Sequence, residues 1–151
     1  MKYILITFIS FTFAAHLSQY NLKPAALPII QGVYDSKLGF TTTLGIQLGY
    51  ASDLAFLGLC SKYSFNKNGS NLFLGYRIIG FLFLTNSVGV NFMNYKDSKL
   101  DEKSNRFFDN VGFEGHVGGM LFHSKIGFFT KTTDFNDNFF DRVNYSFGFG
   151  L

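Results

Sequence analysis

The sequence is poor in cysteine, proline, tryptophan and charge. Among its 151 residues are one cysteine, two prolines and no tryptophan, and charged residues make up 15%, against roughly 25% in an average soluble domain. The single cysteine, Cys60, excludes an internal disulfide framework and a multi-cysteine metal site. The formal charge of +3 is not gathered into a basic stripe, so the composition gives no support for nucleic-acid binding.

Aromatic residues and glycine are abundant instead. The chain contains 21 phenylalanines, 8 tyrosines and 16 glycines. Aromatic and β-branched residues are enriched in strands, so this composition favours β-structure over helices. The length allows one domain with a modest core.

Residues 1–19 have the pattern of a secretory signal peptide. Lys2 supplies a positive start, and an apolar run from Tyr3 to Ala15 follows, of the usual length of about 7–15 residues. That run is shorter than the roughly 20 apolar residues of a membrane-spanning helix. We therefore expect export of the chain, with residues 20–151 forming the folded domain. The alternative interpretation is a retained N-terminal anchor helix.

The last ten residues alternate between large and small side chains. Val143, Tyr145, Phe147, Phe149 and Leu151 share one parity, and polar residues or glycine occupy the other. Successive side chains of a strand point to opposite faces, so this segment predicts a strand with one apolar face. Residues 38–51 repeat the pattern. A strand packed on a soluble core and a strand with one face in lipid both fit it.

Eight strands follow from the alternation and the turn signals between them. They are predicted at residues 29–34, 38–51, 54–65, 71–83, 88–95, 111–122, 125–135 and 142–151. Pro24 and Pro28 predict irregular structure before the first strand, because proline breaks helices and central strands. Short connections at Ser52, Thr85 and His123 alternate with longer, more charged ones, which is typical of an outer-membrane barrel. We therefore expect an all-β fold, a single closed antiparallel up-and-down transmembrane β-barrel.

Inward parity gathers polar and charged side chains in the predicted lumen. The expected interior network consists of Arg77, Glu114, His116, Lys131 and Arg142. Glu114 is the one carboxylate found on that parity, and Arg77 and Arg142 are its expected partners, because an unpaired buried charge is costly. The main expectation is a plugged, hydrogen-bonded lumen, and the alternative is an anion-selective or water-filled path.

The polar residues could in principle form two kinds of chemical site, an acyl-transfer site or a calcium site. Glu114, His116 and Ser146 share inward parity, as an acyl-transfer set would require. No feature of the sequence marks an oxyanion hole, so we expect no enzyme activity. Three acids of one predicted loop lack the frame of a calcium site, and no metal or cofactor is expected; they are Asp134, Asp137 and Asp141.

The chain resembles the small eight-stranded outer-membrane barrels of Gram-negative bacteria, the OmpX-like and OmpA-transmembrane-domain class. The resemblance is carried by Val143-Asn-Tyr-Ser-Phe-Gly-Phe-Gly-Leu151, which looks like that class's C-terminal assembly signal, together with the signal peptide and the eight-strand layout. It implies localisation in the bacterial outer membrane, with outer-membrane lipid and the barrel assembly machinery as partners.

The resemblance also implies a structural, adhesive or surface-interaction role. The mixed-charge stretch from Lys96 to Asn110, the longest polar stretch, is the expected contact surface for a protein partner. Two alternatives stay open: a secreted lipocalin-like barrel that binds an apolar ligand, and a lipid-modifying outer-membrane enzyme.

Overall fold

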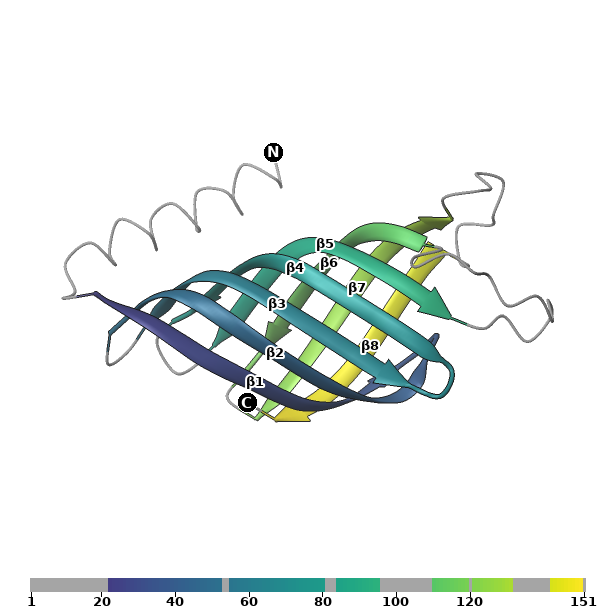
Figure 1. The fold of residues 1–151 in the computed structure, drawn as a ribbon, viewed down its shortest axis with the longest axis horizontal. Coiled ribbons are helices and arrows are strands. Elements are labelled where there is room, and N and C mark those ends of the chain that lie inside the picture. Colours follow the sequence, from purple (N-terminus) through teal and green to yellow (C-terminus); the bar gives the residue numbers. More distant parts are fainter. Residues whose placement is uncertain are drawn as a thin grey trace.

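Eight antiparallel strands, each paired with the next along the chain, form a closed barrel. The computed structural model describes residues 22–52, 55–80, 84–95, 110–119, 121–131 and 142–150. The strands wind around the barrel with a strong tilt (Figure 1). They are β1 (Lys23–Asp35), β2 (Gly39–Ala51), β3 (Phe56–Asn66), β4 (Gly69–Ile79), β5 (Thr85–Tyr95), β6 (Asn110–Gly118), β7 (Phe122–Lys131) and β8 (Val143–Gly150). The predicted all-β, eight-stranded up-and-down barrel is confirmed.

The barrel closes where β1 meets β8. Residues 31–35 of β1 pair with residues 146–150 of β8, whereas β1 pairs with β2 along its full length. The first and last strands are therefore neighbours, as expected from the sequence. Residues 1–21, which include the predicted signal peptide, lie outside the described part of the chain.

The prediction of irregular structure around the prolines was wrong. Strand β1 begins at Lys23 and contains both Pro24 and Pro28. Both lie in the part of β1 that pairs with β2 but not with β8. Proline lacks a backbone N–H and is tolerated where one side of a strand has no neighbour. The local edge explains how this strand holds two prolines.

Two short connections lie elsewhere than predicted. His123 belongs to β7, and the preceding turn instead follows Gly118, with the amide of Gly119 donating to the carbonyl of Phe122 at 2.7 Å. The two adjacent glycines mark a turn, which is their commonest meaning between strands. Thr85 likewise begins β5 instead of forming a turn. Described strand ends differ from the predicted ones by a few residues elsewhere, as at β4, which runs from Gly69 to Ile79.

Side chains of the β1–β2 and β3–β4 turns hold these two turns together. Oδ1 of Asp35 accepts hydrogen bonds from the backbone amides of Lys37 and Leu38 at 2.9 and 3.1 Å. Gly39 closes the turn with a φ of 78°, a left-handed conformation that glycine adopts without steric cost. At the β3–β4 turn, Nδ2 of Asn66 donates a hydrogen bond to the carbonyl of Leu38 at 2.6 Å. One end of the barrel is therefore tightly ordered at two neighbouring hairpins.

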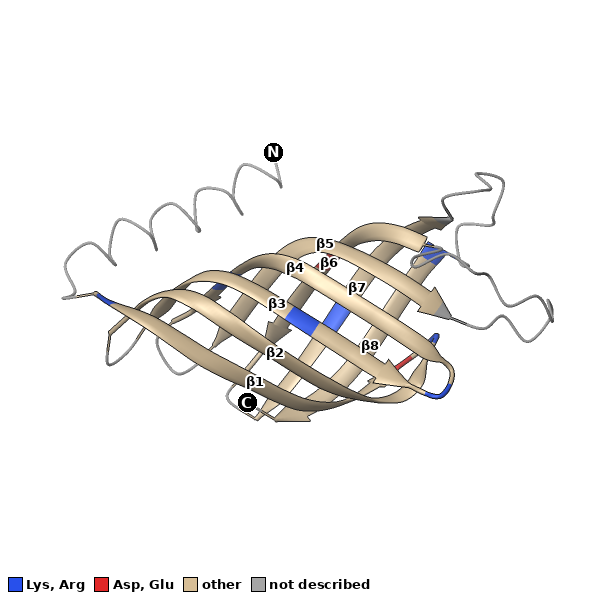
Figure 2. Ribbon diagram, viewed as in Figure 1, with Lys and Arg blue, Asp and Glu red and all other residues tan. Residues whose placement is uncertain are grey.

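The barrel has an apolar outside and a polar inside. Outward positions of β2 other than Thr42 carry large apolar side chains that are exposed, while Thr41, Thr43 and Gln47 point inward and are buried. The buried apolar cluster of the interior is small and consists of Ile29, Cys60 and Phe73. Charged residues are sparse along the strands in Figure 2, where most of the ribbon is tan. Within the described ranges, the structure has no helix long and apolar enough to span a membrane.

Candidate functional site: the polar barrel interior

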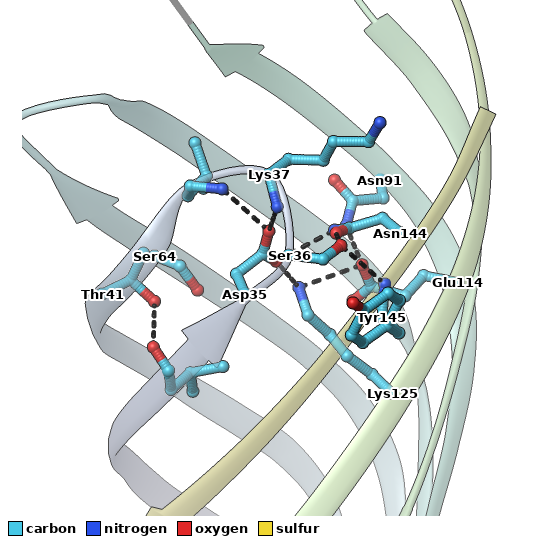
Figure 3. A network of polar contacts seen from close by, with 12 residues as sticks. Asp35, Ser36, Lys37, Thr41, Ser64, Asn91, Glu114, Lys125, Asn144 and Tyr145 are labelled. Atoms are coloured by element: carbon cyan, nitrogen blue, oxygen red, sulfur yellow. Dashed lines mark hydrogen bonds and ion pairs between the residues drawn. The ribbon is translucent and has the colours of Figure 1, made fainter. Parts of the chain in front are cut away.

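An ion-pair network fills the interior of the barrel. The ammonium of Lys125 on β7 lies 3.0 Å from Oδ2 of Asp35 and 3.2 Å from Oε2 of Glu114. Asp35 is 1% exposed and Glu114 is 2% exposed, so both carboxylates are removed from solvent. Figure 3 shows the Lys125 side chain reaching between them. One buried cation therefore compensates two buried carboxylates, from β1 and β6.

Glu114 is also held by His116 and Asn91. Nε2 of His116 lies 2.5 Å from Oε1 of Glu114, and Nδ2 of Asn91 donates to Oε2. On its other side, the His116 ring contacts the Lys62 ammonium, with Nδ1 and Nζ 2.8 Å apart. An ammonium only donates, so Nδ1 accepts and the ring proton sits on Nε2, facing the carboxylate. The network thus runs from Asp35 through His116 to Lys62.

Strand register positions the members of this network. Lys125 is paired with His116 on β6 and with Ser146 on β8, and Ser146 is in turn paired with Asp35 on β1. The three titratable groups therefore follow one inward row around the barrel. Glu114 is paired with Gly89 and Gly127 on the adjacent strands, so neither of the directly paired positions carries a side chain. The space left by these glycines admits the Lys125 and Asn91 side chains.

The Asp35 end of the network is tied to β8. Nδ2 of Asn144 donates to Oδ2 of Asp35 at 2.9 Å, and the hydroxyl of Ser36 donates to Oδ1 of Asn144 at 2.6 Å. The backbone amide of Tyr145 donates to the same hydroxyl at 3.1 Å. Oδ1 of Asp35 accepts hydrogen bonds from two backbone amides of the β1–β2 turn, so both carboxylate oxygens have partners. This region joins the strands that close the barrel.

The structure corrects the expected partners of Glu114. Lys125 forms its ion pair, and neither Arg77 nor Arg142 is among its partners. Arg77 points inward on β4, 7% exposed, and its Nη1 makes no hydrogen bond with the described residues. Arg142 is half-buried just before β8. Lys131 ends β7, and its side chain lies outside the described part of the molecule.

Sequence reasoning missed two members of the network, Lys125 and Asp35. Asp35 was placed in a turn, whereas it is the last inward residue of β1. Lys125 was placed at the start of its strand, next to a turn wrongly set at His123. The alternation of side chains along β7 could have identified Lys125 as an inward residue, because it lies on the same face of the strand as Phe129, which is also buried.

The described part of the interior has little room, and His116 within it is fully engaged. Its cavity of about 10 Å³ accepts roughly one water molecule. Both ring nitrogens of His116 are engaged by Glu114 and Lys62, and the hydroxyl of Ser146 has no hydrogen-bond partner among the described residues. His116 therefore does not activate Ser146. In the same part of the chain, no cluster of acidic, histidine or cysteine side chains could hold a metal ion.

The described residues of the predicted assembly signal lie on the outer wall. Tyr145, Phe147 and Phe149 of β8 are exposed and Val143 is half-buried, while Leu151 lies outside the described residues. The expected contact surface lies outside them too, apart from Asn110, which begins β6. The acids weighed as a calcium site, residues 134, 137 and 141, are likewise not described.

Comparisons of the chain with protein-family models, with curated proteins and with solved structures find no match.

Proposed function

We propose that the protein is an integral β-barrel of the bacterial outer membrane. Its role would be non-enzymatic: a structural, adhesive or surface-interaction protein that presents its longer loops outside the cell. The OmpX-like resemblance of the sequence belongs to this proposal, as do the cleaved signal peptide and delivery by the barrel assembly machinery.

The outer wall carries this proposal. Large apolar side chains are exposed on all eight strands. Among strand residues whose side chains are described, the one exposed charged side chain is Lys23, the first residue of β1. A wall of this kind is much larger than the apolar patches that soluble monomers expose. In lipid it would be matched to its surroundings, and the closed hydrogen-bonded ladder would leave no unpaired strand edge along the closed part of the barrel.

The lumen argues against the alternatives. A lipocalin-like protein needs an apolar interior with space for a ligand, whereas this interior is lined by charged and polar groups around a cavity of about 10 Å³. A lipid-modifying enzyme needs an activated nucleophile, and His116 is fully occupied by Glu114 and Lys62. The interior is better suited to holding the barrel rigid than to binding an apolar ligand or to hydrolytic chemistry.

Fractionation of cell envelopes tests the proposal. We expect the protein to stay in the outer-membrane fraction after carbonate and urea washes, and to migrate faster on a gel when unheated than when boiled. Release by carbonate, or solubility of the purified protein without detergent, would contradict it. Replacing residues 96–109 with a short turn should leave membrane insertion intact and remove binding to a surface partner.

A further inference from the structure

The buried charges of the lumen do not balance. Among the described interior side chains, the cations Lys62, Arg77 and Lys125 face two carboxylates, Asp35 and Glu114. Both carboxylates are engaged by Lys125 at 3.0 and 3.2 Å. Lys62, 5% exposed, and Arg77, 7% exposed, form no ion pair with a carboxylate of the described residues, and Lys62 lies within electrostatic range of both Arg77 and Glu114. A buried cation without an ion-pair partner is costly, and either loss of its proton or a negative charge beside it relieves that cost.

Unused hydrogen-bond donors lie in the same region. The Lys62 ammonium has three N–H groups and uses one on Nδ1 of His116; its other close neighbour is the Phe73 ring, whose centroid lies 5.2 Å away. Asn71, 2% exposed on the adjacent strand, has no hydrogen-bond partner for either amide atom among the described residues. Such groups are rare in folded proteins, and an ordered water molecule or a bound ion is one explanation for them.

The lumen cavity connects these donors. Lys62, Asn71, His116, His123 and Lys125 line it. Glu114 also lines it, but both of its oxygens already accept hydrogen bonds. Its volume of about 10 Å³ admits a species of about the size of one water molecule and excludes phosphate, sulfate or a carboxylic acid.

We propose that the lumen binds one small monovalent anion of the halide class between Lys62 and Asn71. The anion would supply the missing negative charge and accept the unused N–H groups of both side chains. It would act as a structural ion, because the cavity that holds it is too small to form a path through the barrel.

Unfolding of the purified full chain in detergent tests the site. Chloride is compared with gluconate, which is too large for the cavity, at equal ionic strength, so general screening is the same in both salts. A ligand that binds the folded state raises the unfolding midpoint; at about five times its dissociation constant, chloride should raise it by about 2–4 °C over gluconate. Equal midpoints in the two salts would overturn the proposal.

Two variants and a control locate the effect. Lys62→Met and Asn71→Leu each should abolish the difference between chloride and gluconate, and Asn71→Leu decides the matter if Lys62→Met does not fold. Lys67→Met, in the exposed β3–β4 turn, should retain the full difference. Chloride dependence that survives in both interior variants would overturn the site. The outcome is independent of membrane fractionation, so it separates this inference from the proposed function.

Discussion

The ammonium of Lys125 lies 3.0 Å from Oδ2 of Asp35, although β8 separates their strands. The contact joins the β1–β2 turn to the opposite side of the closing strand. Since Lys125 also reaches Glu114, a single side chain connects three strands through the lumen. The stability of the barrel should therefore depend strongly on this residue.

Lys125→Met should destabilise the protein by about 3–5 kcal/mol, because it leaves two buried carboxylates without their cation. Urea unfolding in detergent measures the change. Lys67→Met removes an exposed lysine from a turn and should change the free energy of unfolding by less than about 0.5 kcal/mol. Similar values for the two variants would show that the interior ion pairs contribute little.

A double variant isolates the Lys125–Glu114 pair. Glu114→Gln in the Lys125→Met background removes one of the two uncompensated charges, so the double variant should be more stable than the sum of the single changes predicts, by about 0.5–3 kcal/mol. The full thermodynamic cycle of four proteins provides the measurement. Strict additivity would mean that the 3.2 Å contact carries no coupling.

The free-energy cost of a charge added to the outer wall should depend on its position if the wall lies in lipid, and not if the wall lies in water. Leu74 lies at the middle of β4 and is 45% exposed, and Leu121 lies in the β6–β7 turn and is 58% exposed. In lipid vesicles, Leu74→Arg should cost about 2–4 kcal/mol and Leu121→Arg about 0–1 kcal/mol, since the penalty follows depth. In a soluble barrel both changes would be nearly neutral. Equal small effects in vesicles would contradict membrane insertion.

Gly39 should tolerate substitution poorly. Its φ of 78° places it in the left-handed region, so Gly39→Ala should cost about 1–2 kcal/mol. Gly115→Ala is the matched control, because a Cβ atom at Gly115 would meet nothing within 4 Å. The unfolding midpoints of the two variants make the comparison. If Gly115→Ala is the more damaging, the turn does not limit the stability of this hairpin.

The lumen should not conduct ions. The described lumen cavity, lined by Phe73, Lys62 and His116 among others, has about 10 Å³, room for about one water molecule, and side chains nearly fill a barrel of eight strands. Planar-bilayer recordings of the wild-type protein should show no stepwise current. Steady channel openings would contradict this prediction and would show that the buried ion pairs rearrange to open a path.

The fold was predictable because its pattern is local. In β2 and β8, each inward residue is small or polar and each outward residue except Thr42 is large, so parity alone identified both faces. Strand β3 lacks this contrast: Leu59 is exposed and Cys60 is buried, yet both are apolar. Its orientation depends on pairing with β2 and β4, which sequence alternation cannot supply.

The interior partners were harder to predict than the strands. Glu114 and His116 are two residues apart on one strand, so the alternation of side chains is enough to predict that they lie side by side on the same face. Asp35 and Lys125 meet only because the last strand lies beside the first and because the register aligns Ser146 with both. A shift of the predicted turn by a few residues, from the Gly118–Phe122 connection to His123, was enough to hide this relationship.

The short seam between β1 and β8 has a kinetic consequence. Asp35 and Asn144, which bond across it, are 109 positions apart in the chain. The other ladders join neighbouring strands and can zip from their turns, whereas this one must wait until the whole chain is arranged. The seam is then the last part to form, and the Asp35–Lys125 contact is a marker of completed closure. A spectroscopic probe at Asp35 would time the final step of assembly.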